Sequence, residues 1–343
     1  MSDHHHHDHS HSHSHSQPVR EALAGEPLVR GAGDGLLLYL DAGSGIAGDM
    51  LVAGLLDLGV PQRVVEAGLA GIDVGPYTLR VQRVLRSGIA ASHFSVLVEG
   101  TQPSRDYRQI VQLLEAADTL TDRARTLALR AFEILARAEA EVHACPIDQV
   151  HFHEVGAVDS IVDITAAAIA IDHLGAEIHC SPLPIGRGSV RSQHGIIPLP
   201  APATVLCLRG VPTYDAGLEA ELVTPTGACL VATAAHSFGP WPKFRPERVG
   251  MSAGTREWPD RPNLLRVVLG TPDASNAEPG RSHGRHVVLE ANIDDLSPEV
   301  AAFALSRALA AGALDAWTTP IGMKKGRAAQ TLSLLCEREK LDE

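Results

Sequence analysis

Hydrophobic and polar positions divide the chain into a polar beginning, a long mixed region and a short final region. Residues 1–34 are mostly polar, whereas Leu36–Leu40 is an apolar run typical of a buried β-strand. Apolar residues then recur at helical spacing from Met50 to Gly59, and Pro61 beyond them favours a helix end. We therefore expect a strand, a glycine-rich turn and a helix where the folded region begins.

The next patterns predict two antiparallel strands followed by helices. The stretches YTLRVQRVLRSG and IAASHFSVLVEG read as strands joined at Ser87-Gly88. From about Asp106 to Ala144 helix-forming residues carry an apolar stripe, which we assign to the core or to a subunit contact in a homo-oligomer. The run 157–175 is apolar at nearly every position and predicts a buried helix.

The final region has the pattern of an incomplete ferredoxin-like unit. Residues 270–285 form a polar Gly/Pro/Ser linker, and 286–343 read as strand, helix, strand and strand. This stretch lacks the last helix and strand of the ferredoxin-like pattern, so we expect the domain either to be loose or to be completed by another chain; a sequence that is part of a longer chain is a further alternative. The predicted fold class is α+β (mixed α/β), with a disordered His-rich tail over 1–34 and a mixed-sheet core domain over 35–269.

Composition narrows the class of protein. The chain has 343 residues, is 45% hydrophobic and carries a formal net charge of −12, which favours a soluble globular protein and argues against a nucleic-acid surface. No apolar run is long enough for a membrane helix, and the polar beginning is unlike a secretory signal. Five scattered cysteines without a CxxC pair indicate neither a disulfide framework nor a thiolate cluster. A cytoplasmic location is expected.

Histidines are concentrated at the very beginning of the chain. Residues 1–16 read MSDHHHHDHSHSHSHS, and flexible imidazoles of this kind can chelate a divalent ion weakly and reversibly. An expression tag is the alternative. Because serines interrupt the run, we favour a native metal reservoir.

Potential metal ligands are densest in HFHEVGAVDSIVD, residues 151–163. His151 and His153 point to the same side if this segment is extended, and Asp159 and Asp163 share one face of the predicted helix. Nitrogen and oxygen ligands together suit nickel, zinc or iron better than calcium. We therefore predict a metal site formed by these four side chains. The alternative is a helix-capping acid beside ordinary hydrogen-bonded histidines.

The glycine-rich turn is a candidate anion site. Gly43-x-Gly45-x-x-Gly48 matches the dinucleotide-binding fingerprint literally, but the antiparallel strands that follow argue against a dinucleotide fold. A turn between a strand and a helix still offers backbone amides to a phosphate. The predicted substrate contacts here are Asp41, Ser44, Gly45, Gly48 and Asp49. A purely structural tight turn is the alternative.

Two later loops have similar features. Arg187 lies in SPLPIGRGS, where flanking glycines allow its guanidinium to reach a phosphate or carboxylate. Thr224 precedes Pro225 as a helix N-cap, and Thr226 follows, which predicts a second anion site. Simple turn chemistry explains either loop equally well.

The final region carries a candidate nucleotide site. Asp294 and Asp295 precede its helix and can hold magnesium or manganese, and Lys324, Lys325 and Arg327 form a basic turn suited to phosphates. The alternatives are an acidic N-cap and a solvated charge run.

Eight stretches in order between Leu38 and the end carry a family pattern. They read YLDAGSGIAGDM, HFHEVGAVDSIVDI, SPLPIGRG, PLPAPAT, ELVTPTGA, AGTREWPDRPN, EANIDDLSPE and GALDAW with PIGMKKGR. Together they closely resemble the LarC family of nickel insertion proteins. The resemblance departs at Ala42-Gly43, where many relatives have Cys-Phe, and at Leu296 and Ala328, where Met and Pro are commoner. The family chain normally extends beyond Glu343.

The resemblance implies a specific reaction. Members are CTP-dependent cyclometallases of the lyase class, which insert Ni(II) into pyridinium-3,5-bisthiocarboxylic acid mononucleotide through nickel–sulfur and nickel–carbon bonds. CTP, held with magnesium or manganese, is cleaved to CMP and pyrophosphate, and the product serves a lactate racemase-like acceptor. The ring carbon must lose a proton, and we assign the base to His151 or His153, with Glu154 beside them.

Two other functions remain compatible with the sequence. The chain can be a nickel-storage or metallochaperone protein whose tail binds the metal and whose core docks a partner. A nicotinamide-dependent oxidoreductase, suggested only by the glycine pattern, is the weaker alternative.

Overall fold

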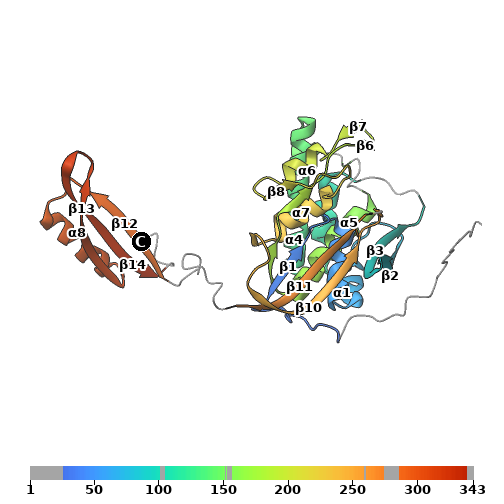
Figure 1. Ribbon diagram of the computed structural model, residues 1–343, viewed down its shortest axis with the longest axis horizontal. Coiled ribbons are helices and arrows are strands. Elements are labelled where there is room, and N and C mark those ends of the chain that lie inside the picture. Colours follow the sequence, from blue (N-terminus) through green and yellow to red (C-terminus); the bar gives the residue numbers. More distant parts are fainter. Residues whose placement is uncertain are drawn as a thin grey trace, which may run out of the picture. The chain divides into compact units, whose positions relative to one another are not determined.

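The computed structural model describes residues 26–100, 105–150, 152, 157–258, 260–273 and 286–337. Contacts divide the chain into two compact units, with the boundary between Asp273 and Ala274 (Figure 1). The tail over residues 1–25 and the ligand candidates at positions 151, 153 and 154 lie outside the described residues. No described helix has the length and apolar character needed to cross a membrane.

A seven-stranded mixed sheet forms the centre of the N-terminal unit. Its strand order is β2-β3-β10-β11-β1-β4-β9. The bounds are β1 Leu37–Asp41, β2 Tyr77–Arg86, β3 Ile89–Val98, β4 Glu177–Cys180, β9 Ser237–Phe238, β10 Phe244–Ala253 and β11 Leu264–Pro272. Strand β1 runs parallel to β4 and antiparallel to β11. The predicted hairpin is confirmed, because β2 pairs with β3 around Ser87-Gly88.

Helices pack on one face of this sheet (Figure 1). They are α1 Gly48–Leu58, α2 Gln62–Leu69, α3 Tyr107–Ala116, α4 Asp122–His143, α5 Val158–Leu174, α6 Pro202–Cys207 and α7 Pro225–Ala234. Two small sheets lie beside them, pairing β5 Leu183–Ile185 with β8 Thr213–Asp215 and β6 Ser189–Ser192 with β7 Gly195–Pro198.

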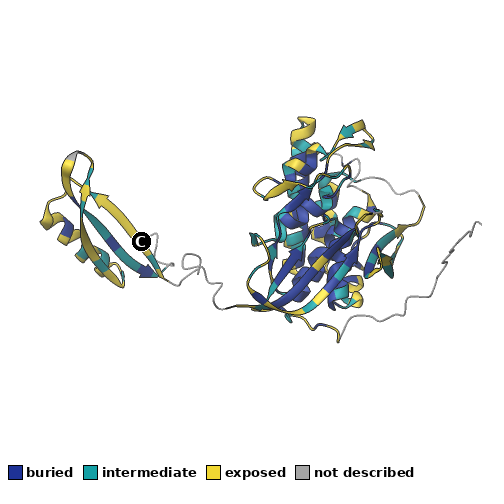
Figure 2. Ribbon diagram, in the orientation of Figure 1, coloured by how far each residue is buried: buried dark blue, intermediate teal, exposed yellow. Residues whose placement is uncertain are grey.

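Alternation along β1 explains which side of the sheet the helices cover. Leu38 and Leu40 point into the main core and are at most 1% exposed, whereas Tyr39 belongs to a separate small cluster on the opposite face. Helix α5 is buried along almost its whole length, as its all-round apolar sequence predicts. Figure 2 shows this core as dark blue ribbon through the N-terminal unit.

Three predicted boundaries need correction. Residues 26–34, which the prediction placed in a disordered tail, belong to the N-terminal unit: Leu28 is buried in its core, and Arg30 forms an ion pair with Asp172 at 2.7 Å. The helical region 106–144 is two helices, because Thr121 caps a new helix by accepting a hydrogen bond from the Ala124 amide. The linker was predicted to begin at residue 270 because of its Gly/Pro/Ser composition, but strand β11 continues to Pro272. Residues 270–272 pair with β10. The Gly-Thr-Pro sequence resembles a turn locally, but the neighbouring strand supplies hydrogen-bond partners that no local pattern reveals.

The C-terminal unit contains β12 His286–Ile293, α8 Pro298–Ala310, β13 Asp315–Met323 and β14 Arg327–Glu337. Its sheet order is β12-β14-β13, as expected for three strands of a ferredoxin-like unit. The predicted α+β fold class, with an incomplete ferredoxin-like domain after the mixed-sheet domain, is therefore confirmed.

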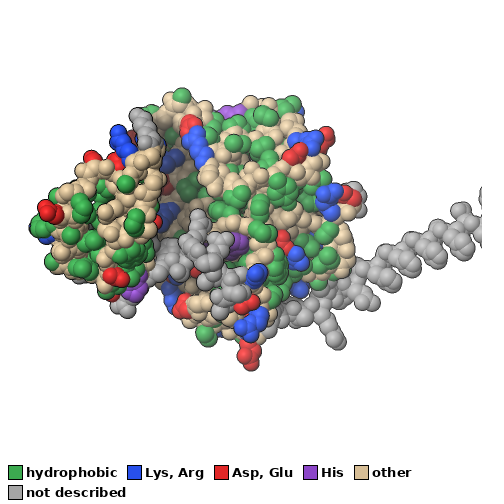
Figure 3. All heavy atoms as spheres, turned by 60° about the vertical axis from the view of Figure 1, so that its left-hand side comes forward, with side chains coloured by type: hydrophobic (Ala, Val, Ile, Leu, Met, Phe, Trp, Pro, Cys, Tyr) green, Lys and Arg blue, Asp and Glu red, His purple; other side chains and the backbone are tan. Residues whose placement is uncertain are grey.

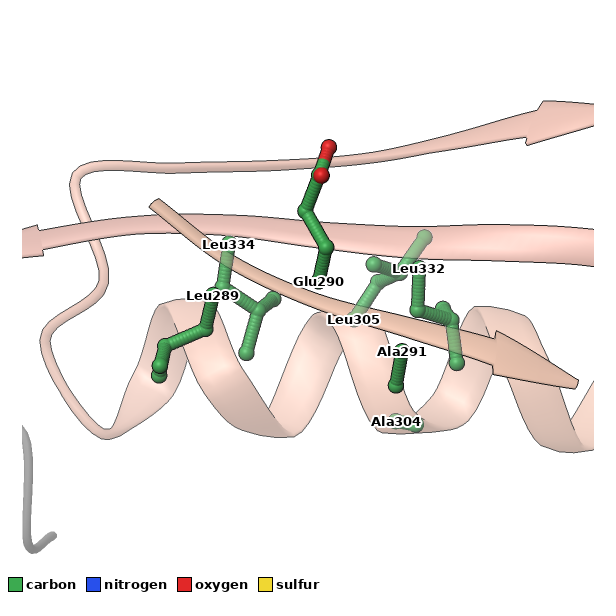
Figure 4. Close-up of a pocket in the computed structure, with 7 residues that line it drawn as sticks. All are labelled: Leu289, Glu290, Ala291, Ala304, Leu305, Leu332 and Leu334. Carbon is green, nitrogen blue, oxygen red and sulfur yellow. The ribbon is translucent and has the colours of Figure 1, made fainter. Parts of the chain in front are cut away.

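This unit buries little of its apolar surface. Figure 2 shows it mainly as exposed or intermediate, and Figure 3 shows hydrophobic side chains across its visible surface. Phe303 on α8 is 64% exposed. A groove of about 230 Å³ separates α8 from strand β12 (Figure 4). Its lining consists of Leu289, Glu290, Ala291, Ala304, Leu305, Leu332 and Leu334.

Candidate functional site

The N-termini of helices α1, α5 and α7 converge at the end of strand β1. The turn after β1 forms a parallel bridge between Ile46 and Val223, just before α7. The Gly48 amide, at the start of α1, donates to Thr226 Oγ1 in α7 at 3.3 Å. Asp163 from the second turn of α5 packs against Gly48. Three positive helix ends therefore face one region, which favours negative charge there.

Glycine is required where the turn meets its neighbours. A Cβ placed on Gly48 would lie 2.9 Å from the Asp163 Cβ, and one on Gly45 would lie 1.9 Å from the Leu222 carbonyl oxygen. Gly45 also has a φ of 105°, a conformation that side chains disfavour. These glycines let α1 approach α5 and α7 closely enough to bring their polar groups together.

Carboxylates gather at this junction. Burial raises the pKa of Asp49 to about 6, opposed by the Met50 amide that donates to it and assisted by the charge of Asp159. Burial also raises the pKa of Asp163 well above its usual range, and the charges of Asp49 and Asp159 add to the effect. Asp163 Oδ1 is buried and has no hydrogen-bond partner among the described residues.

Such a group of acids is unfavourable without a positive partner. Burial removes water from the carboxylates, and their like charges repel, so both effects favour protonation. A bound cation would reverse this balance and give the unpaired oxygen of Asp163 a partner. Across the described ranges no three His, Cys, Asp or Glu side chains form a ready metal cage. A cation here would need further ligands.

The predicted histidine ligands cannot be placed, because positions 151, 153 and 154 lie outside the described residues. Phe152 between them is buried, with its ring centroid 6.4 Å from that of Phe132 in α4. Four residues separate Phe152 from Ala157, the N-cap of α5. The prediction of histidine ligands therefore stays a prediction.

Thr224 and Thr226 belong to the same junction. Thr224 caps α7 by accepting from the Gly227 amide at 3.1 Å, as its position before Pro225 predicts. Its hydroxyl lies 2.9 Å from that of Thr226. Hydroxyls at this place can bind a substrate oxygen or serve only as caps.

The turn's backbone amides are mostly occupied within the protein. Ala42 donates to Ser181 Oγ, Gly45 to the Ala42 carbonyl, and Ile46 to the Leu222 carbonyl. Few backbone amides of the turn are therefore free to bind a phosphate, and phosphate binding by Gly45 and Gly48 stays a prediction. Their close packing against neighbouring residues is a feature of the structure.

Other predicted substrate contacts lie apart from these carboxylates or have partners of their own. Asp41 ends β1 and forms an ion pair with Arg266. Ser44 donates to the Pro262 carbonyl at 3.1 Å. Arg187 is exposed and pairs with Asp215 at 2.8 Å. We call the group formed by Asp49, Asp159 and Asp163 at the helix starts the acidic junction. The structure does not bring Arg187 into contact with it.

Of the C-terminal candidates, Asp294 lines a small cavity. Asp294 forms an ion pair with Arg327 at 3.0 Å, and the cavity beside it has a volume of about 240 Å³. Asp295 is exposed, as is Lys324 in a short 3₁₀ turn. The Lys325 side chain lies outside the described part of the structure.

Sequence reasoning missed the meeting of Gly48, Asp163 and Thr226. These residues are far apart along the chain, and the only available signal was that each lies near a predicted helix start. Helix α1 follows β1, whereas α5 and α7 precede β4 and β9. Because these three strands are parallel neighbours, all three helix starts lie at the edge of the sheet where the strands end, but this strand order could not be read from the sequence.

Comparison with known proteins identifies the family of the chain. A family model described as nickel insertion protein matches residues 38–343. The chain belongs to the nickel insertion protein family. A relative from Geobacter sulfurreducens, named as a nickel insertion protein, is 48% identical over 310 residues, which cover 90% of this chain and 78% of the relative. No solved structure gives a significant match.

A second family member carries a more specific name. The protein from a Nocardioides species is named pyridinium-3,5-bisthiocarboxylic acid mononucleotide nickel insertion protein. It is 45% identical over 300 residues, which cover 87% of this chain and 74% of the relative. The family resemblance drawn from the eight sequence stretches is thus confirmed.

Proposed function

We propose that this chain inserts nickel into pyridinium-3,5-bisthiocarboxylic acid mononucleotide. The observation that carries the proposal is the acidic junction, where Asp163 presents a buried and unpaired oxygen beside Asp49. The name of the Nocardioides relative supports the choice of substrate. The junction supplies the negative charge that a divalent ion needs, and the organic ligand supplies sulfur.

Nickel would first be held by oxygen and nitrogen ligands. We assign these to Asp159 and Asp163 together with His151 and His153. The metal would then pass to the thiocarboxylate sulfurs, which are softer ligands than carboxylate. As nickel bonds to the ring carbon, the proton on that carbon leaves to a base, which we assign to His151 or His153, with Glu154 near it. Ni(II) is thus cargo and substrate.

Phosphate recognition would fall to groups near the junction. The substrate is a mononucleotide, and the capping hydroxyls of Thr224 and Thr226 stand at a positive helix end. Asp49 lies at the start of α1, and Ser44 belongs to the turn that leads to it, where its hydroxyl donates to the Pro262 carbonyl. Arg187 reaches the substrate only if its ion pair with Asp215 opens.

CTP would bind the C-terminal unit. Asp294 lines the cavity of about 240 Å³, and with Asp295 it can hold magnesium or manganese. The basic side chains of Lys324, Lys325 and Arg327 would contact the phosphates. Cleavage of CTP to CMP and pyrophosphate would drive insertion, and a lactate racemase-like enzyme would accept the finished cofactor.

A second polypeptide would complete the C-terminal unit. Within residues 286–337 strand β12 pairs on one side only, with β14, and the groove beside α8 is lined by apolar residues such as Leu289 and Leu334 (Figure 4). A helix in this groove followed by a strand on β12 would restore the four-stranded ferredoxin-like sheet. The exposed edge and groove support this proposal, because such surfaces are normally covered.

A nickel-insertion assay tests the proposed function. Purified protein is mixed with the organic mononucleotide, Ni(II), CTP and magnesium or manganese, and the nickel-bearing product is followed by its absorbance and mass. The proposal predicts product from the intact chain and an at least tenfold loss for Asp163→Asn. An Asp122→Asn variant, which removes an exposed ion pair with Arg125 elsewhere, is the matched control.

The same assay distinguishes nickel insertion from the alternative function, nickel storage or delivery. A storage or metallochaperone protein would bind nickel through its tail, form no product under any condition and deliver the metal equally well as the Asp163→Asn variant. Repeating the assay with a polypeptide that completes the C-terminal unit shows whether CTP cleavage depends on it. Absence of product in both forms would contradict the proposed function.

A further inference from the structure

The face of the large sheet opposite the helices carries an aromatic cluster. Tyr39, Phe244 and Val268 form a small core there, separate from the main one. The chain between β9 and β10 crosses this cluster and places Trp241 over it. The Tyr39 hydroxyl donates weakly to the Gly239 carbonyl at 3.4 Å, which fixes the start of the crossing segment.

Trp241 is held firmly and yet remains open to solvent. Its ring lies edge-on to Tyr39 at 5.1 Å between centroids and tilted against Phe244 at 5.4 Å. These contacts orient the indole, but 47% of the residue is exposed. A large aromatic group that is both fixed and half exposed is typical of a binding surface, because little entropy is lost when a ligand stacks on it.

Arg266 places a fixed positive group over one face of this ring, so a ligand would stack on the part of the indole that the guanidinium leaves uncovered. Its guanidinium carbon lies 5.9 Å from the Trp241 ring centroid. Its Nε donates to Asp41 Oδ2 at 2.8 Å, and its Nη2 donates to the same oxygen. Its Nη1 makes no hydrogen bond to any residue that the structure describes. The guanidinium is therefore held in position with one donor edge available to a ligand.

The position of these two residues links them to the acidic junction. Asp41, which anchors Arg266, is the last residue of β1. The turn from Ala42 to Ala47 leads directly from it to Gly48 and Asp49 at the start of α1. The carboxyl end of β1 is also where ligands bind in sheets with parallel strands.

We infer that Trp241 and Arg266 form a subsite for the substrate's aromatic ring and one of its anionic ring substituents. The inference rests on the proposed function, since it names how that substrate is recognised. A pyridinium ring carries positive charge and is attracted to the face of an indole. A carboxylate or thiocarboxylate on that ring lies in the ring plane, where the free edge of a guanidinium can reach it.

The ion pair of Arg266 with Asp41 determines which anions the subsite would bind. Asp41 neutralises most of the local charge, so the subsite does not attract every anion as a cluster of lysines would. Selectivity then depends on a ligand that satisfies both groups at once, a flat cationic ring and an attached planar anion. A free phosphate lacks the ring and would bind weakly.

Binding of two simple pyridinium mononucleotides tests the inference. Nicotinic acid mononucleotide carries a ring carboxylate, and nicotinamide mononucleotide has an uncharged amide at the same position. Their dissociation constants are measured by calorimetry with the intact chain, at fixed ionic strength. We expect the acid to bind about tenfold more tightly than the amide, because only the acid gives Arg266 a charged acceptor.

Variants assign the effect to each residue. Trp241→Leu should weaken both ligands about tenfold, and Trp241→Phe should retain most of the affinity because it keeps an aromatic face. Arg266→Gln should weaken only the acid and abolish the preference. The control Arg209→Gln breaks an exposed bidentate pair with Glu141, and Trp317→Leu removes an exposed indole of the C-terminal unit. Both controls should bind as the unchanged chain does.

The same variants keep this inference separate from the proposed function. In the insertion assay, Trp241→Leu and Arg266→Gln should raise KM for the organic substrate while nickel binding without that substrate stays unchanged. Absence of binding by the unchanged chain, or equal binding by variants and controls, overturns the subsite. If the subsite binds both probes as expected but no nickel is inserted, the proposed function fails and the subsite stands.

Discussion

The two units of this protein differ in how much of their apolar surface is buried within the unit itself. In the N-terminal unit Leu38 is fully buried and α5 is enclosed by other elements. In the C-terminal unit Phe303 is 64% exposed, and α8 has one buried residue, Ala301. A deep core can hold desolvated acids in place, whereas a half-covered sheet cannot.

This difference suits the two units to different tasks within the proposed function. The N-terminal unit keeps Asp49 and Asp163 close together against their repulsion, which requires rigid surroundings. The C-terminal unit offers an open groove and a cavity whose mainly apolar lining includes Asp294 and Gln330, and both suit partners arriving from solution. We therefore expect metal chemistry in the first unit and nucleotide binding with subunit completion in the second.

The largest predicted effect is on core stability. Leu38→Ala should lower the free energy of unfolding of the N-terminal unit by about 2–5 kcal/mol, because it leaves a cavity in a closed core. Urea denaturation followed by far-ultraviolet circular dichroism measures the change. A loss below about 1 kcal/mol would show that this core is much looser than its burial implies.

The second effect concerns the close approach of α1 and α5. Gly48→Ala should lower the free energy of unfolding by about 1–3 kcal/mol, since its Cβ would lie 2.9 Å from the Asp163 Cβ. Gly43→Ala is the matched control, because its Cβ would have only Asp41 Oδ1 at 3.8 Å. Equal effects in the two variants would contradict the packing described at the junction.

The third effect is the pH dependence of the acidic junction. Asp49 has a folded pKa of about 6 against an unfolded value near 3.8, so the folded state binds more protons between these values. The contribution of Asp49 to the stability of the metal-free protein is present below pH 4 and is lost as pH rises to about 6. Nickel affinity should rise over the same range, because the metal displaces the proton. Calorimetry at several pH values measures both trends.

The smallest effect is expected on the exposed face of α8. Phe303→Ser should change the free energy of unfolding by less than about 0.5 kcal/mol in the chain alone, because the ring contacts little. Substitution of the buried Leu38 by serine would lower the free energy of unfolding far more. If Phe303→Ser destabilises the chain strongly, its ring must be covered within the chain itself.

Local pattern was enough for most individual elements. The strand before the glycine turn, the hairpin at Ser87-Gly88, the apolar helix α5 and the Thr224 cap were all predicted from spacing and turn chemistry. The order of the sheet and the meeting of Gly48 with Asp163 were not, because they depend on contacts between distant residues. The gap between α3 and α4 was missed because Thr121 is a weak signal within a helix-forming stretch.

The candidate site was predicted only in part. Asp159 and Asp163 were singled out from their spacing, and the structure adds that Asp49, Thr224 and Thr226 share their surroundings. Arg187 was grouped with them from chemistry alone, whereas its position is set by the loop that pairs it with Asp215. Residue type indicates what a side chain can bind, and only the fold shows which side chains act together.

Nickel binding to the Asp163→Asn variant tests the central claim most directly. Equilibrium dialysis with radioactive nickel would compare the variant with the unchanged sequence, both starting at residue 26 so that the tail histidines do not contribute. We predict one bound nickel per unchanged chain, an at least tenfold weaker affinity for the variant, and a higher melting temperature for the metal-free variant, because an uncharged amide replaces an acid whose ionised form is unfavourable there. Unaltered affinity together with an unaltered melting temperature would contradict a metal site at this junction.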